Sequence, residues 1–174
     1  MLTLGYSKQM SHEAITEVGS LHEHVGETVT VLGWADATRS HGKVGFLVLR
    51  DGTGLVQGVL LKKELPEDTW ALHESITKES TVSLTGEVRE EPRAPGGFEI
   101  GVTALDLLSL SEEYPIQPKE HGVEFLLDHR HLWLRSSQQR AGLKVRHEVE
   151  HAIHEFFYER DFVRIDTPIL TGSI

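Results

Sequence analysis

The hydrophobic pattern of the chain begins with three apolar runs of strand length, broken by two turns. These runs predict β-strands over residues 28–35, 43–50 and 55–61, and Asp51-Gly52-Thr53-Gly54 predicts a tight turn before the third. Upstream, apolar residues at helical spacing predict a short helix over residues 14–25.

After the third run the pattern changes to a short helical segment and then returns to strands. Pro66, followed by acids and by apolar residues at helical spacing, predicts a helix over residues 66–76. Alternation over residues 81–89 and 98–104 predicts two more strands, and it places Ala104 on the apolar face of the last one. Three strands, a helix and two strands is the order of the five-stranded OB barrel, which presents a face around its second and third strands to oligonucleotides.

The last third of the chain follows a different pattern. Two prolines, a glycine and mixed charges in residues 111–127 indicate a linker or hinge. Ser136 and Gln139 fit a capping box, which predicts a long amphipathic helix to about residue 159. Residues 162–165 then predict a short strand.

These elements divide the chain into four parts. We expect a loose tail over residues 1–12, a five-stranded domain over residues 13–110, a hinge over residues 111–127 and the start of a second domain over residues 128–174. Because one helix and one strand cannot enclose a core of their own, we expect this second domain to continue beyond Ile174.

Composition and charge narrow the class of function. A net charge of −10 argues against generic affinity for nucleic acid, although basic residues gather locally at Arg39, Lys43, Arg50, Lys62 and Lys63. The chain has no cysteine, which excludes disulfides and favours a reducing compartment. It shows neither a signal-peptide pattern nor an apolar run near the roughly 20 residues of a membrane span, so we expect a cytoplasmic protein without membrane partners.

Three side chains in the first three strands have the chemistry to hold an unstacked nucleotide. Arg39 offers a cation, Phe46 a stacking surface, and Gln57 a paired donor and acceptor for the edge of a base. Taken alone, Phe46 would be a core aromatic and Arg39 a surface charge. Their occurrence together favours an RNA-binding face.

Three histidines, His147, His151 and His154, stand at helical spacing and raise the question of a metal site. Arginine and glutamate are interleaved with them, opposite the apolar stripe of the helix. This pattern favours a solvated or interface-rim face, and we expect no metal there.

The stretch GWADATRSHGKVGFLVLRDGTGLVQGV resembles the anticodon-binding OB barrel of the class IIb aminoacyl-tRNA synthetases, which serve aspartate, asparagine and lysine. The resemblance implies that Arg39, Phe46 and Gln57 recognise the central uridine of the anticodon. RHLWLR at residues 130–135 is similar to the asparagine-type hinge, whereas the aspartate and lysine enzymes read closer to RYLDLR.

The segment FVRIDTPIL resembles motif 1 of class II synthetases, with its proline at Pro168. The resemblance implies a homodimer interface built from the long helix and this segment. It also implies the fold class: an OB barrel, a hinge, and the motif 1 helix and strand that begin an antiparallel α/β catalytic domain.

The resemblance implies that the parent enzyme uses ATP and magnesium to attach asparagine to its tRNA through an aminoacyl-adenylate. Motifs 2 and 3, which grip ATP in the family, have no counterpart in this sequence. We therefore expect no catalytic residue, no bound cofactor and no activity from these 174 residues alone. Two alternatives stay open: a stand-alone RNA-binding OB module with a dimerising helix, and an aspartyl-type or asparagine-forming relative.

Overall fold

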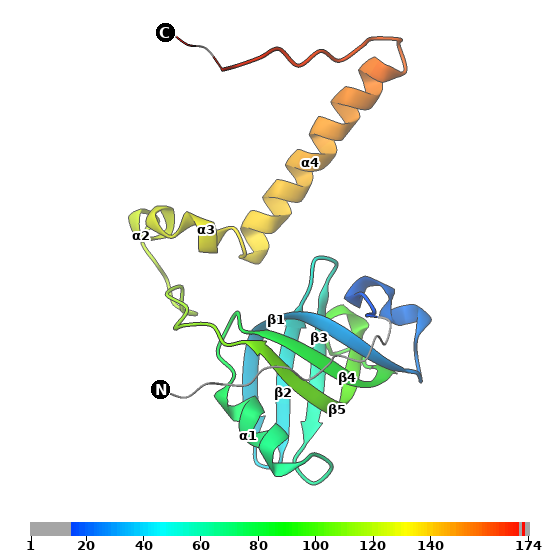
Figure 1. Cartoon of the computed structure of the whole chain (residues 1–174), viewed down its shortest axis with the longest axis vertical. Coiled ribbons are helices and arrows are strands. Elements are labelled where there is room, and N and C mark those ends of the chain that lie inside the picture. Colours follow the sequence, from blue (N-terminus) through cyan, green and yellow to red (C-terminus); the bar gives the residue numbers. More distant parts are fainter. Residues whose placement is uncertain (1–14, 171, 173–174) are drawn as a thin grey trace. The chain divides into compact units, whose positions relative to one another are not determined.

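A computed structural model describes residues 15–170 and residue 172 of the chain, which forms two compact units, Met1–Pro115 and Ile116–Ile174 (Figure 1). The division falls inside the expected hinge. The expected tail and the first residue of the expected upstream helix lie outside the described residues.

The first unit is a closed β-barrel with the strand order β1-β2-β3-β5-β4 (Figure 1). All neighbouring strands are antiparallel except β3 and β5, which are parallel. The strands are β1 Thr28–His41, β2 Val44–Arg50, β3 Leu55–Leu61, β4 Thr81–Glu90 and β5 Phe98–Ser109. The strand and helix order predicted for an OB barrel is therefore confirmed.

Strand β1 runs six residues further than the sequence pattern predicted. Its last part, from Thr38 to His41, is exposed and polar, so it gives no hydrophobic alternation. It is nevertheless a strand because it pairs with β2 from Val48 to Val44 after a bulge between Ala35 and Ala37. Arg39 consequently lies within a strand and not at its end.

The upstream helix is shorter than predicted. It is a 3₁₀ helix, η1, over Val18–Glu23, with Val18 and Leu21 buried against the barrel. Its first turn is held from outside because the Asp51 carboxylate accepts a hydrogen bond from the Val18 amide at 2.8 Å. Gly26, with a φ of 83°, then turns the chain into β1.

Helix α1 occupies Glu67–Ser75, close to the predicted range, and Pro66 is its N-cap residue. Trp70 and His73 are its buried residues, so both an aromatic and a titratable ring face the barrel. A second short 3₁₀ helix, η2 at Pro95–Gly97, joins β4 to β5.

The face assigned to Ala104 was wrong. The pairing of β4 with β5 shifts register, so that Thr85 faces Ala104 whereas Gly86 faces Val102. Thr103 is thus an extra residue in β5, and such a bulge inverts the alternation beyond it. As a result Ala104 is exposed and Leu105 is buried.

The barrel core is built from the inward residues of all five strands. Alternation places Leu47, Leu49, Val56, Leu60 and Leu84 inside with no measurable exposure. Ile100 completes this group at the parallel junction of β3 and β5. The outward residues of β1, β2 and β3 therefore lie on a rigid, well-packed support.

The second unit consists of α2 Val123–Asp128, α3 Arg130–Trp133 and α4 Ser137–Tyr158 (Figure 1). Within the segment expected to be a hinge, the residues from Val123 onward form a helical turn. Phe125 stabilises that turn by stacking between His121 and His129, with ring centroids 4.7 Å and 4.3 Å away. None of these helices is long and apolar enough to cross a membrane, as far as the chain is described.

The predicted start of α4 at Ser136 is confirmed, since the Ser136 hydroxyl accepts a hydrogen bond from the Gln139 amide at 3.4 Å. The reciprocal half of a capping box is not formed, because the Ser136 amide donates to the Trp133 carbonyl at 2.9 Å. The apolar stripe of α4 is open: Val145, Val149 and Ile153 are each more than half exposed. Among its described residues this unit buries none, in agreement with the expectation that it has no core of its own.

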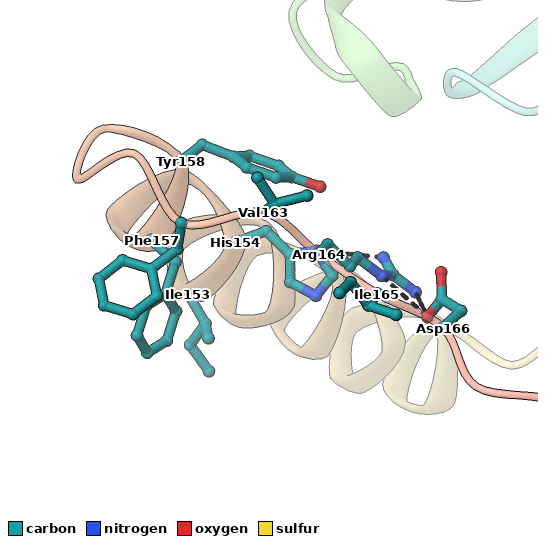
Figure 2. Close-up of a pocket in the computed structure, with 9 residues that line it drawn as sticks. Ile153, His154, Phe157, Tyr158, Val163, Arg164, Ile165 and Asp166 are labelled. Carbon is teal, nitrogen blue, oxygen red and sulfur yellow. Dashed lines mark hydrogen bonds and ion pairs between the residues drawn. The ribbon is translucent and has the colours of Figure 1, made fainter.

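Residues 162–165, predicted as a strand, pair with no strand among the described residues. Figure 2 shows this segment running back along the end of α4. Arg164 links the two, because its Nη1 lies 3.2 Å from His154 Nδ1 while its guanidinium donates to Asp166 at 3.0 and 3.1 Å. A strand needs a hydrogen-bonding neighbour, and this segment has none to pair with in the described residues.

Candidate nucleic-acid interface

The structure brings Arg39, Phe46 and Gln57 together on the outer face of β1, β2 and β3. Arg39 is paired directly with Phe46, and Gln57 is paired with Val48, two residues further along β2. Residues of the same parity on adjacent strands share a face. Three residues separated by up to 18 positions in the chain thus form one surface, which we call the reading face.

The guanidinium of Arg39 connects the other two side chains. Its Cζ lies 4.5 Å from the centroid of the Phe46 ring, a cation–π contact, and its Nη2 donates to Gln57 Oε1 at 3.3 Å. Arg39 is exposed, while Phe46 and Gln57 are half-buried. The geometry therefore brings together the three residues that the sequence singled out, and their role stays a prediction.

Phe46 is not a core residue. Its neighbours Gly45 and Leu47 are buried on the inner side of β2, whereas Phe46 points outward with Val48. The ring is half-buried, and the Arg39 guanidinium lies over it. The arrangement suits a planar ligand that stacks on the ring.

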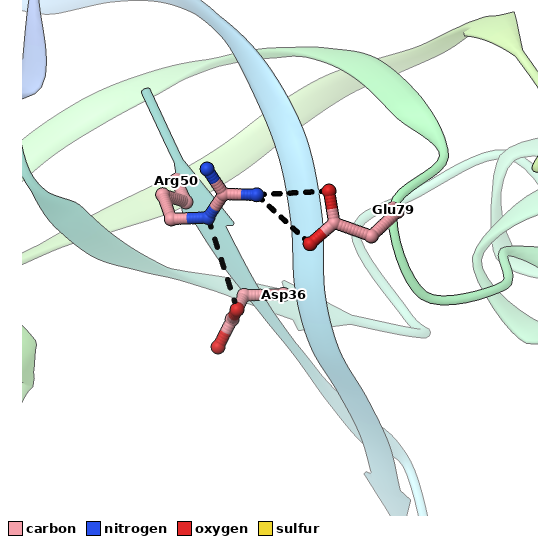
Figure 3. A network of polar contacts seen from close by, with 3 residues as sticks. All are labelled: Asp36, Arg50 and Glu79. Carbon is pink, nitrogen blue, oxygen red and sulfur yellow. Dashed lines mark hydrogen bonds and ion pairs between the residues drawn. The ribbon is translucent and has the colours of Figure 1, made fainter. Parts of the chain in front are cut away.

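Arg50 does not belong to the basic group of the reading face, contrary to the sequence interpretation. It is only 8% exposed, and its Nη2 donates to both carboxylate oxygens of Glu79 at 2.8 Å (Figure 3). Its Nε lies 3.9 Å from Asp36, and its Cζ lies 5.5 Å from the Trp34 ring. Its charge is compensated inside the structure, so it acts as a brace between β2 and the segment before β4.

Three exposed lysines lie near the reading face. Lys43 and Lys62 are neighbours, because the Lys62 amide donates to the Lys43 carbonyl at 2.9 Å. Lys63 follows directly, and its ammonium lies 3.4 Å from Glu64. These three residues, which we call the lysine cluster, lie where β2 begins and β3 ends. They supply local positive charge in an acidic chain.

The turn between β2 and β3 fixes the position of Gln57. Asp51 Oδ1 accepts hydrogen bonds from the amides of Thr53 and Gly54 at 2.7 and 2.8 Å, and Oδ2 accepts from Val18. Burial acts to raise the pKa of Asp51, but these hydrogen bonds outweigh it and hold the pKa below its usual value. The sequence indicated the turn but gave no sign of its contact with η1.

His73 is the residue near the site that the sequence interpretation missed. It is 2% exposed, and its Nε2 lies 3.3 Å from the Ser40 hydroxyl, one residue beyond Arg39. The available signal was its place three residues after Trp70 on the predicted helix, which puts both rings on one face.

The histidines of α4 form no metal centre in the described part of the chain. No group of three or more metal-ligating side chains occurs there. His154 instead contacts Arg164 and packs edge-on against Tyr158, with ring centroids 6.2 Å apart.

Comparison with known proteins adds two family matches. Residues 29–108 match the OB-fold nucleic acid binding domain family, and residues 122–174 match the class II tRNA synthetases of the D, K and N group. The two matches fall on the barrel and on the helical unit in turn. The chain corresponds to the N-terminal region of the class II aminoacyl-tRNA synthetases.

Individual relatives support the asparagine branch. The chain is 52% identical to the asparagine–tRNA ligase of Desulforamulus reducens over 158 residues, and 54% identical to that of Pelotomaculum thermopropionicum over 153 residues. These alignments cover 91% and 88% of this chain. The chain spans only 37% and 36% of the length of those two relatives.

Solved structures show the same fold. The chain resembles asparaginyl-tRNA synthetase from Pyrococcus horikoshii, complexed with asparaginyl-adenylate, at a TM-score of 0.81 and 32% identity. The match covers 94% of this chain and 38% of that one. An aspartyl-tRNA synthetase from Entamoeba histolytica, at 23% identity and a TM-score of 0.78, shares the fold.

Proposed function

We propose that this chain is the anticodon-reading part of an asparagine–tRNA ligase, and that its reading face recognises the central uridine of the anticodon. The observation that carries the proposal is the joint placement of Arg39, Phe46 and Gln57 on one face of an OB barrel. The similarity to asparagine–tRNA ligases supports the choice of amino acid.

The contact between Arg39 and Gln57 gives a physical reason for preferring uracil. Because Gln57 Oε1 accepts a hydrogen bond from Arg39, the amide is oriented with its Nε2 available as a donor. The O4 atom of uracil accepts a hydrogen bond from such a donor. Cytosine carries an amino group at that position, which would oppose Nε2 donor to donor.

Phe46 supplies affinity and the lysine cluster supplies charge. A base stacked on Phe46 gains the same contact whatever its identity, since every base has a flat π-face. Lysines contact phosphates without reading sequence. Within this set, Gln57, oriented by Arg39, is the residue placed to distinguish uracil from cytosine.

The Gln57→Ala variant should lose most of the preference for a stem-loop with a central U over one with a central C. Losing one well-aligned hydrogen bond corresponds to about 1 kcal/mol, which changes the ratio of the two dissociation constants roughly fivefold. Equilibrium titration of both stem-loops measures this. The matched control is Lys43→Ala, which should weaken the binding of both RNAs equally. It should also lower the slope of log affinity against log salt concentration by about one. Equal losses on both RNAs for Gln57→Ala would show that Gln57 is not a reader.

We propose further that the complete protein activates asparagine with ATP and magnesium and works as a homodimer in the cytoplasm. The open apolar stripe of α4 and the exposed Pro168 segment support an interface role for this part of the chain. ATP-binding motifs 2 and 3 are absent from these 174 residues, so neither ATP nor magnesium is expected to bind them.

Residues 1–174 alone should therefore show no ATP–pyrophosphate exchange with asparagine. The positive control is a full-length protein in which this sequence is joined to a catalytic region, and the exchange of labelled pyrophosphate into ATP is the measurement. Exchange by residues 1–174 above the level of a reaction without protein would contradict the proposal, because it would show that amino acid activation does not need motifs 2 and 3. Absence of exchange in the full-length protein would favour a non-catalytic RNA-binding module, and exchange with aspartate in place of asparagine would favour an aspartyl-type enzyme.

A further inference from the structure

The outer part of β1, which carries Arg39, is paired on one side only. β1 pairs with β4 from Thr28 to Trp34, but beyond that point it pairs with β2 alone, up to His41. β2 itself is also paired with β3, with Phe46 opposite Val59. The β1 edge at Arg39 therefore has one ladder fewer than the rest of the barrel, and a side chain packed behind it adds to its support.

Helix α1 provides that support through His73, which lies behind the hairpin. The imidazole Nε2 is 3.3 Å from the Ser40 hydroxyl. On the facing strand the ring packs against Gly45, where an added Cβ would lie 2.6 Å from the same Nε2. Ser40 and Gly45 are paired with each other, and the next pair along the β1–β2 ladder is Arg39 with Phe46.

The imidazole is suited to a fixed, neutral role. Burial lowers the pKa of His73, with smaller opposing effects from the Arg39 backbone and the Glu74 charge. The Trp70 ring packs against it at 5.7 Å, and its Nδ1 has no hydrogen-bond partner in the described residues. A neutral ring fits such a site, whereas an added proton would be poorly solvated there.

We propose that His73 is a positioning residue for the reading face: it wedges against Ser40 and Gly45 and so holds Arg39 and Phe46 in register with Gln57. This proposal rests on the proposed function, because it concerns the geometry with which the face reads a base. His73 does not itself contact the RNA. Its effect should be seen in selectivity rather than in the mere presence of binding.

The test uses His73→Leu in the full chain, with stem-loops carrying a central U or C titrated below the melting temperature of every variant. We expect the U-over-C preference to fall about fivefold, the worth of one well-aligned hydrogen bond. His73→Gln, which can still reach the Ser40 hydroxyl, should keep most of the preference. Ile76→Ala is the matched control, because it removes a buried side chain next to α1 and should destabilise the barrel without changing selectivity.

Dependence on pH provides a second readout. Because the pKa of His73 is lowered in the folded chain, its contribution is complete above the unfolded pKa of about 6.5 and is lost as the pH falls through the folded pKa. Wild-type selectivity should fall on acidification, and that of His73→Gln should change less. Should His73→Leu misfold, Ser40→Ala should lower selectivity in the same direction through the same contact.

The outcomes separate the two proposals. A wild-type chain with no preference for U overturns the proposed function and the positioning role together. A wild-type preference that His73→Leu and Ser40→Ala both retain overturns the positioning role alone. A loss of selectivity in Ile76→Ala equal to that in His73→Leu would also overturn it, since selectivity would then follow stability.

Discussion

The Glu79→Ala variant should be destabilised by about 3–5 kcal/mol, because it leaves the Arg50 guanidinium buried without its partner. Both side chains of this pair are almost fully buried, at 10% and 6% exposure, so solvent screens the interaction little. A loss of this size is a large fraction of the total stability of a domain, typically about 5–15 kcal/mol. Urea unfolding monitored by circular dichroism would measure it.

Two variants act as controls for this brace. Asp36 is partly exposed and lies 3.9 Å from Arg50 Nε, so Asp36→Ala should cost no more than about 1 kcal/mol. The double variant Arg50→Met with Glu79→Ala removes both charges and should recover most of the lost stability. Glu79 has a φ of 67°, and alanine bears the same backbone strain, so strain does not enter the comparison. A loss below about 1 kcal/mol for Glu79→Ala would show that water reaches Arg50.

The Phe46→Ala variant should weaken binding of an anticodon stem-loop by about 1–3 kcal/mol, or roughly 5- to 150-fold. The ring is the planar surface of the reading face, and a stacked base loses that whole contact when the ring is removed. The loss should be similar for a central U and a central C, in contrast to Gln57→Ala. Fluorescence anisotropy with a labelled stem-loop is the measurement.

Phe46→Tyr is the matched control because it preserves the aromatic face, and its affinity should stay near that of the wild type. The thermal stability of Phe46→Ala should change little, since Phe46 lies on the outer side of β2. Unchanged RNA affinity in Phe46→Ala would show that no base stacks on the Phe46 ring. An affinity loss accompanied by unfolding would mean that Phe46 serves the fold.

Much of the barrel could be predicted because its strands alternate or run apolar with clear turn signals between them. The β3 limits were predicted to the residue, and the Asp51 turn was identified from its residue types. The hydrophobic pattern gives no sign of a strand whose residues are exposed on both faces. The outer part of β1 is polar on both faces, and only its ladder with β2 makes it a strand.

Two errors come from tertiary interactions that the local sequence pattern does not encode. The bulge at Thr103 arises from the register between β4 and β5 and reverses the face of Ala104. The burial of Arg50 depends on Glu79, 29 residues away, whose carboxylate reaches it. Neither the register nor this partner can be read from the residues near Ala104 or Arg50.

The reading face could be predicted more completely than its support. Arg39, Phe46 and Gln57 were identified because a cation, an aromatic ring and an amide occur together in three consecutive strands, a combination that matches RNA-binding chemistry. His73 was not identified, since a buried histidine on an amphipathic helix resembles any core residue. Its contact with the hairpin depends on how α1 packs against β1 and β2.

The central claim is that this chain reads a uracil, and the most direct measurement is the affinity of the wild-type chain for two anticodon stem-loops that differ only in the middle base. At about 0.1 M salt, where long-range attraction is largely screened, the stem-loop with U should bind more tightly than the one with C by about 1–3 kcal/mol, the usual worth of reading one base. Equal affinities for the two RNAs would contradict the claim.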